Sequence, residues 1–227
     1  MFLENKLNKS LFSPKHPVSI SIRLSLLLAL IGGFLDAYTF IDRGGVFANA
    51  QTGNIVLLGI HIANRDWLHM LLYLLPIIAF IIGVLVSNFI KNDTKYHTEK
   101  AVIIIEIIII LFLSFIPDSV SDTFVNIVIS FIASVQVSTF RKLIDYPYCS
   151  TMCTGNLRSA SDAFFLYIKT KDNNELKKCS AYILIIVFFI LGAILSSFIT
   201  THYNAKSLLV CVFLLIIAYI LLHFDNK

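Results

Sequence analysis

The stretch "DRGGVFANAQTGNIVLLG", residues 42–59, lies between two long apolar runs and decides the fold that we expect. Glycines and uncharged polar residues are concentrated in it: Gly44, Gly45, Asn49, Gln51, Thr52, Gly53, Asn54 and Gly59. Irregular backbone at membrane depth is tolerated only where protein or a water-filled cavity surrounds it. We therefore expect a loop that enters the membrane, turns and starts a short helix.

The composition around this stretch is that of a membrane protein. The 227 residues are 57% hydrophobic and only 14% charged, with a mean hydropathy of +0.82, which a soluble domain of this length does not match. Lys and Arg form no patch with interleaved aromatic residues, so nucleic acid is not an expected partner. Apolar runs long enough to cross a bilayer fall at about 22–41, 67–90, 101–116, 123–142, 179–201 and 207–224.

Two sequence patterns occur twice in the same order. "TGN" stands at 52–54 and at 154–156, and "FIIGVLVSNFI" at 80–90 resembles "FILGAILSSFI" at 189–199. Each TGN follows a span and precedes a short segment, Ile55–Ala63 or Leu157–Ile168. As a helix from Gly53 to Asn64, about 18 Å long, the first segment reaches near half the bilayer. The pattern predicts a duplication, with repeats at 22–117 and 118–227.

The distribution of positive charge decides whether the short segments cross the membrane. If they do not cross and residues 1–21 form a cytoplasmic tail, only Arg43, Arg65 and Lys206 of the 18 Lys and Arg residues lie outside. If both segments cross, the charges divide far more evenly and Arg158 falls inside the membrane. The positive-inside rule therefore favours the first arrangement, with both termini cytoplasmic.

The expected fold is an all-α membrane protein of six transmembrane helices. Three spans in each half is an odd number, so the halves form two inverted three-span repeats, each with a re-entrant polar loop and a half-helix. Inverted repeats with interrupted elements at matched positions are typical of transporters and channels. The lipid bilayer and a small solute of unknown identity are the expected partners, and a homo-oligomer stays open. No cofactor is expected.

The expected ligand site lies at the paired motifs. Thr52 and Thr154 are suited to cap the short helices. The positive helix ends would favour an anion or a carbonyl-bearing group. The alternative is that these groups bind each other and hold the halves together. The proposed ligand-binding residues are Asp36, Asn49, Gln51, Thr52, Gly53, Asn54, Gln136, Thr154, Gly155 and Asn156.

Acidic residues within spans are the other candidates. Asp36 is expected to face the bundle interior, where it binds a cation, carries a proton, caps a nearby backbone, or pairs with Arg43 or water. Glu106 in "VIIIEIIII" has no obvious partner in the sequence and is either protonated or a packing contact. Arg158 and Asp162 stand four residues apart and are expected to pair with each other.

The remaining polar residues indicate packing rather than chemistry. Gly83 with Ser87 and Gly192 with Ser196 form small-xxx-small faces, which permit close helix contact. Cys149 and Cys153 have no second ligand pair nearby, so reduced thiols are expected for these and for the other cysteines, Cys179 and Cys211. His61 and His69, near the expected outer surface, form no metal-ligand pattern, and no metal site is expected.

The stretch "GGFLDAYTFIDRGGVFANAQTGNIVLLG" resembles the signature of the YoaK family of small bacterial integral membrane proteins. Gly33–Asp36–Ala37, Gly45–Phe47 and Thr52–Gly53–Asn54 carry the match, and the second TGN fits the family's repeated pattern. The resemblance implies a six-span protein of the bacterial inner membrane. It implies no reaction and no substrate.

Three functions are expected, and the inverted repeat with its paired polar motifs favours transport. The first is a small-solute transporter or channel-like protein with its site at the two TGN half-helices. The second is a membrane-embedded enzyme that uses Asp36 or Glu106 as general acid–base groups, although no nucleophile or metal set accompanies them. The third is a non-catalytic membrane scaffold. Solute flux in liposomes without chemical change separates the first from the others.

Overall fold

The computed structural model describes most of the chain after the N-terminal segment. The expected cytoplasmic tail 1–21 and Cys149 lie outside the described residues. The described ranges are 22–93, 98–117, 119–140, 142–143, 146–147 and 153–224.

The described residues form helices almost throughout. Apart from the short 3-10 helix η2 and one antiparallel strand pair, every described element is an α-helix. In chain order the elements are α2 (Ile22–Asp42), α3 (Gln51–Ala63), α4 (Trp67–Asp93), α5 (Thr98–Leu113), α6 (Asp122–Thr139), β1 (Lys142–Leu143), β2 (Tyr146–Pro147), α7 (Cys153–Thr170), α8 (Asn173–Tyr203), η2 (Asn204–Leu208) and α9 (Leu209–Phe224).

Four of the described helical segments are long and apolar enough to cross a membrane, namely Ile22–Asp42, Trp67–Ile90, Asp122–Thr139 and Asn173–His223. The last has 51 residues and contains α8, η2 and α9, which η2 separates. Helix α5 has 16 residues, about 24 Å at 1.5 Å per residue. Each of the six expected apolar runs thus corresponds to a helix, and the expected helical membrane fold is confirmed at this level.

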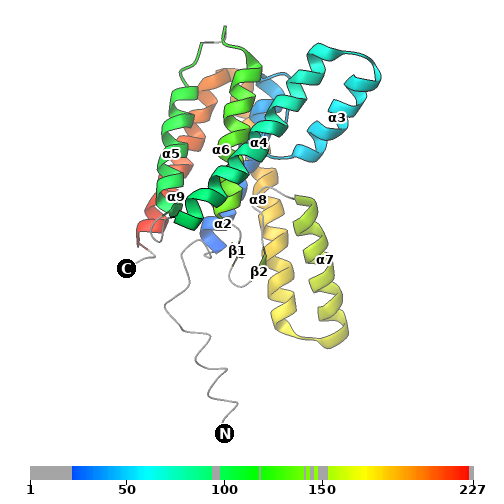
Figure 1. Ribbon diagram of the computed structural model, residues 1–227. Coiled ribbons are helices and arrows are strands. Elements are labelled where there is room, and N and C mark those ends of the chain that lie inside the picture. The colour runs from blue at the N-terminus through cyan, green and yellow to red at the C-terminus, as the bar shows by residue number, and fades with distance from the viewer. Residues whose placement is uncertain are drawn as a thin grey trace.

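Helix packing follows a crossed pattern, in which long helices from the first half of the chain pack against long helices from the second half (Figure 1). Helix α2 packs most extensively against α8, and α6 packs in the same way against α4. Helices α5 and α9 also pack against each other, with α9 beside α2 and α5 beside α6. Large apolar side chains that this packing leaves exposed, among them Leu85 and Phe89 on α4 and Phe198 on α8, are typical of a surface that faces lipid.

Glycines set how closely these helices approach. A Cβ on Gly192 of α8 would overlap the carbonyl oxygen of Leu30 on α2, and one on Gly83 of α4 would overlap Ser134 on α6. The neighbouring Ser87 Oγ lies 3.3 Å from Thr139 Oγ1 across the α4–α6 interface. The packing role predicted for the small-xxx-small faces is confirmed.

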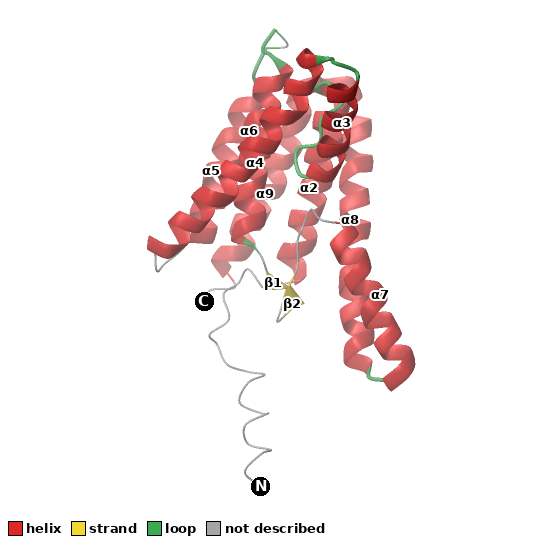
Figure 2. Ribbon diagram, turned by 45° about the vertical axis from the view of Figure 1, so that its right-hand side comes forward, coloured by secondary structure: helices red, strands yellow, loops and turns green. Residues whose placement is uncertain are grey.

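The two short helices lie at opposite ends of the bundle. In both views α3 begins near mid-height and runs to one end beside α4, while α7 begins near mid-height and runs to the other end beside α8 (Figures 1 and 2). The end that α7 reaches is also where α2 begins and α9 ends (Figure 1). Each short helix and its long neighbour therefore form a helical hairpin.

The helix starts differ from the predicted caps. Helix α3 begins at Gln51 after Ala50, whose side chain makes no capping hydrogen bond, and α7 begins at Cys153. Thr52 and Thr154 are thus each the second residue of a helix, and their predicted role as N-caps is wrong. The amides of Ala48, Asn49 and Ala50, which precede α3, lie near the carboxylate of Asp36.

Candidate functional site

The polar stretch between α2 and α3 turns sharply at two glycines. Gly44 and Gly45 have φ angles of 78° and 75°, a left-handed conformation that residues with a Cβ rarely adopt. The amide of Gly45 donates to the carbonyl of Phe40, 3.2 Å away. The chain thereby reverses after α2, and residues 46–50 lead back to the start of α3.

Asn54 holds the returning loop. Its Nδ2 donates to the carbonyl of Phe47 at 2.6 Å, and its Oδ1 accepts from the Phe47 amide at 3.0 Å. The same Nδ2 donates to Gln51 Oε1 at 2.9 Å, and Gln51 Nε2 donates to the carbonyl of Ala48 at 2.9 Å. Both amide side chains therefore serve the loop's own backbone, while Thr52 is exposed. The ring of Phe47 packs against Gly53.

Asp36 anchors this loop to α2. Asn49 donates its backbone amide to Asp36 Oδ1 at 2.6 Å and its side-chain Nδ2 to the carbonyl of Gly32 at 3.2 Å. The backbone amides of Ala48 and Ala50 also lie close to the carboxylate. Asp36 is 4% exposed and therefore buried. Of the roles expected for Asp36, capping a nearby backbone is the one that these contacts support.

Two oxygen atoms beside this anchor accept no hydrogen bond. Asp36 Oδ2 and Asn49 Oδ1 are both buried and have no partner among the described residues. Buried acceptors are normally paired, because leaving one unpaired costs about 1–3 kcal/mol. The pair is therefore a candidate ligand position, although Arg43 Nη2 and Asn126 Oδ1 are unpaired in the same way.

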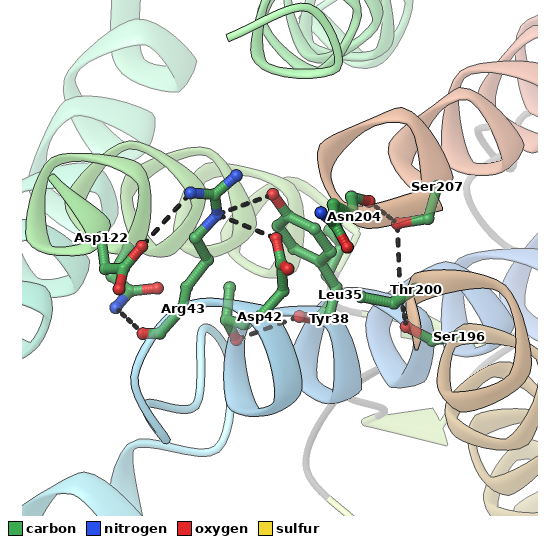
Figure 3. Close-up of polar contacts among 11 residues, drawn as sticks. Leu35, Tyr38, Asp42, Arg43, Asp122, Ser196, Thr200, Asn204 and Ser207 are labelled. Carbon is green, nitrogen blue, oxygen red and sulfur yellow. Dashed lines mark hydrogen bonds and ion pairs between the residues drawn. The ribbon is translucent and has the colours of Figure 1, made fainter. Parts of the chain in front are cut away.

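Arg43 does not pair with Asp36 and instead contacts other side chains at the end of α2 and the start of α6. Its Nε donates to Tyr38 Oη at 2.9 Å and lies 3.2 Å from Asp42 Oδ2, and its Nη1 donates to Asp122 Oδ1 at 3.2 Å (Figure 3). The carbonyl of Arg43 accepts from Asn126 Nδ2 at 2.8 Å. This cluster joins the end of α2 to the start of α6, so the ion pair between Asp36 and Arg43 that was one alternative does not form.

A second polar chain closes the end of α8. Ser196 Oγ lies 3.3 Å from Thr200 Oγ1, which donates to Ser207 Oγ at 3.0 Å, and Ser207 donates to the carbonyl of Asn204 (Figure 3). Asn204 has a φ of 46°, where the helix turns into η2. These bonds satisfy the turn and indicate a structural role.

The second TGN motif opens α7. Thr154 and Gly155 are exposed, whereas Asn156 is 3% exposed and makes contacts of its own. Arg158 Nε lies 3.9 Å from Asp162 Oδ2, so the predicted pair forms on an exposed face of the helix. No hydrogen bond in the described part of the chain joins the two TGN motifs to each other.

Gln136 forms hydrogen bonds with Glu106 rather than with the TGN motifs. Its Nε2 is 2.9 Å from both carboxylate oxygens of Glu106, and both side chains are buried. Glu106 therefore has a partner that the sequence did not reveal. A cavity of about 110 Å³ beside Glu106 is otherwise lined by apolar side chains of α4, α5 and α6.

The structure also gathers a group that no motif predicts. His61 at the end of α3, Asp66 in the turn and His69 in α4 place ligand atoms within 4.8 Å of one another. The spacing H-x4-D-x2-H spans a turn between helices, so the turn geometry is needed before the three residues form a pattern.

Comparisons with known proteins agree with the helical membrane fold. The chain is 28% identical over 178 residues to the UPF0700 transmembrane protein YoaK of Bacillus subtilis (strain 168), and this alignment covers 74% of the chain and 79% of that protein. No solved structure is significantly similar. A family model described as "Protein of unknown function (DUF1275)" matches residues 24–221. The resemblance to the YoaK family is thereby confirmed, and the chain is a membrane protein that belongs to this DUF1275 family.

Proposed function

We propose that the protein is a six-span transporter or channel-like protein for a small solute, with Asp36 and Asn49 at the binding site. The carrying observation is the pair of buried oxygens, Asp36 Oδ2 and Asn49 Oδ1, which have no partner in the described residues. They lie where an irregular loop contacts α2 and starts a short helix. In a membrane protein such backbone is tolerated where it lines a cavity or contacts protein.

Crossed packing supports two inverted repeats, 22–117 and 118–227. Helix α2 pairs with α8 as α6 pairs with α4, and α3 lies on α4 as α7 lies on α8. Each of these relations maps onto the other when the halves are exchanged. The two short helices run to opposite ends of the bundle (Figures 1 and 2), as repeats of opposite orientation require.

The orientation follows from the positive charges. Lys169, Lys171, Lys177 and Lys178 lie around the turn between α7 and α8, at the end of the bundle where α2 begins and α9 ends (Figure 1). We place this end in the cytoplasm of a bacterial cell, with both termini on that side, because cytoplasmic loops carry an excess of Lys and Arg.

The chemistry of the site favours a cation or a hydrogen-bond donor. An anion was the expected ligand of a helix N-terminus, but the carboxylate of Asp36 already contacts the amides of Ala48, Asn49 and Ala50, which directly precede α3. What remains are two acceptor oxygens, one of them carrying charge. A buried carboxylate is stable only when it is neutralised by a proton, a metal cation or an amine. We infer that one of these occupies the site.

The alternative of a membrane-embedded enzyme has less support. Asp36 and Glu106 share no hydrogen bond in the described residues, and Gln136 already binds both oxygens of Glu106. The cavity beside Glu106 is not lined by Asp36. The two carboxyl groups therefore do not form one acid–base site.

Flux measurements in liposomes test the proposal. The wild-type protein is expected to carry Na⁺, H⁺ or methylammonium down a gradient faster than empty liposomes do, without chemical change to the solute. Asp36→Asn should abolish this flux while the purified variant keeps a cooperative melting transition. Asp162→Asn is the matched control, because it removes the same charge from an exposed position on α7. Equal flux in Asp36→Asn and wild type, or no flux above empty liposomes for any of the three probes, would refute the proposal.

A further inference from the structure

The turn between α3 and α4 brings two imidazoles onto one carboxylate. His61 lies in the last turn of α3 and His69 in the first turn of α4, with Asp66 between the helices. The amide of Asp66 donates to the carbonyl of His61 at 2.9 Å, and Arg65 has a φ of 56°. This tight connection brings the end of one helix next to the beginning of the other.

The two carboxylate oxygens of Asp66 make different contacts. Oδ1 accepts the backbone amide of His69 at 3.3 Å and so caps the start of α4. Oδ2 lies 2.8 Å from His69 Nδ1 and 3.2 Å from His61 Nδ1. The capping contact orients the carboxylate, and its second oxygen is directed at both rings.

Ring contacts hold the two imidazoles in place. The rings of His61 and His69 stack with centroids 5.3 Å apart, and Tyr73 stacks on His61 at 5.4 Å. Fixed imidazoles lose less freedom when they bind a ligand, as in metal sites whose ligands are oriented by their neighbours. The Tyr73 contact thus acts as a support behind the site.

Water and metal ions in solution can reach the three side chains. Side-chain exposures of 22%, 37% and 62% for His61, Asp66 and His69 leave the group accessible from water.

We propose that His61, Asp66 and His69 bind one divalent transition-metal cation of the zinc class. Tetrahedral bonds of about 2.0–2.2 Å separate neighbouring ligand atoms by about 3.4 Å. The observed distances of 2.8 Å and 3.2 Å to Asp66 Oδ2, and the 4.8 Å limit for the whole set, need only small side-chain rotations to reach that value. Two imidazoles and one carboxylate favour Zn²⁺, Co²⁺ or Ni²⁺ over Mg²⁺ and Ca²⁺.

Three protein ligands leave a fourth position for water or another donor, as in open zinc sites. The metal would join the last turn of α3 to the first turn of α4, at the end of the bundle opposite to the α7–α8 turn (Figure 1). In the orientation proposed above, this is the external side. The metal site itself does not depend on transport, because its ligands come from a single turn.

Metal titration of the purified full-length protein tests this inference. After removal of any affinity tag and dialysis against metal-free buffer, calorimetry with ZnCl₂ should give one site per chain with a micromolar or lower Kd. Addition of CoCl₂ should produce the visible absorption of tetrahedral Co²⁺, and Zn²⁺ should abolish it. Binding should also raise the melting temperature, because the metal joins two helices.

Conservative variants identify the ligands. Asp66→Asn and His69→Gln should each weaken Zn²⁺ binding by more than the roughly 10–100-fold that loss of an outer-shell partner costs. His202→Gln, an exposed histidine at the end of α8, is the matched control and should bind as wild type does. Melting of the metal-free variants checks that they fold. Absence of Zn²⁺ and Co²⁺ binding in the folded wild type, or unchanged binding in both ligand variants, would overturn the assignment.

Discussion

Substitution of Gly192 by alanine is the sharpest test of the helix packing. A Cβ at this position would overlap the carbonyl oxygen of Leu30 and lie 3.0 Å from the amide nitrogen of Phe34. Both neighbours are backbone atoms of α2, so no side chain can rotate out of the way. Because a carbon normally approaches a carbonyl oxygen no closer than about 3.3 Å, α2 and α8 must separate.

The expected cost follows from two opposing terms. Overpacking that shifts backbone costs about 1–3 kcal/mol, and a contact between two backbones belongs at the upper end of this range. Replacing a helical glycine with alanine returns about 0.5–1 kcal/mol through the helix propensity. We therefore expect Gly192→Ala to lower the free energy of unfolding by about 2 kcal/mol. For a chain of this size this corresponds to a fall of roughly 4–8 °C in Tm.

Thermal unfolding of the detergent-purified variants measures the effect. Gly59→Ala is the matched control, because Gly59 is also helical and an added Cβ there has no neighbour within 4 Å. It should unfold at or above the wild-type temperature. Gly83→Ala should be intermediate, since part of its conflict is with the Ser134 hydroxyl, which can rotate. If Gly192→Ala melts no lower than Gly59→Ala, the close approach of α2 and α8 is wrong.

Two further predictions follow from named contacts and a third from the proposed topology. Asn54→Ala should lower the free energy of unfolding by about 1–3 kcal/mol because the loop loses its bonds to Phe47, whereas Thr52→Ala, at an exposed position, should melt as wild type does; equal Tm values for the two variants would contradict this. Gln136→Leu should lower Tm by leaving Glu106 unpaired, and a second change, Glu106→Leu, should restore it; a double variant that melts as low as the single one would contradict the pairing. In a variant without native cysteines, Asn64→Cys should react with an impermeant maleimide added outside the cell; reaction only after lysis would contradict the proposed topology.

Helix positions follow from the sequence because hydropathy is a local property. The apolar run expected at 67–90 corresponds to Trp67–Asp93, and the short helix expected from Gly53 to Asn64 corresponds to Gln51–Ala63. In a membrane each backbone group must be satisfied within its own helix, so the amino acids of one segment are enough to predict that helix. The repeated "FIxGxxxSxFI" pattern identified the packing glycines for the same reason.

The site could be predicted only in part. The polar loop, the buried Asp36 and the pair of Arg158 and Asp162 were predicted from residue types. The caps assigned to Thr52 and Thr154 were wrong, because both helices begin before these residues, and the loop amide of Asn49 before α3 donates instead to Asp36 of α2.

Tertiary structure alone decided which polar groups meet. Asp36 accepts a hydrogen bond from Asn49 and does not pair with Arg43. Glu106 accepts from Gln136, and the ring of His61 stacks on that of His69. Each of these choices depends on the rotation of a helix about its axis and on the direction of a turn. The sequence alone does not give these rotations and turn directions, whether the partners come from one turn, as His61 and His69 do, or from separate helices, as Glu106 and Gln136 do. The sequence thus determined a helical membrane protein with an interrupted polar segment, and the tertiary structure determined which of its buried polar side chains pair with one another.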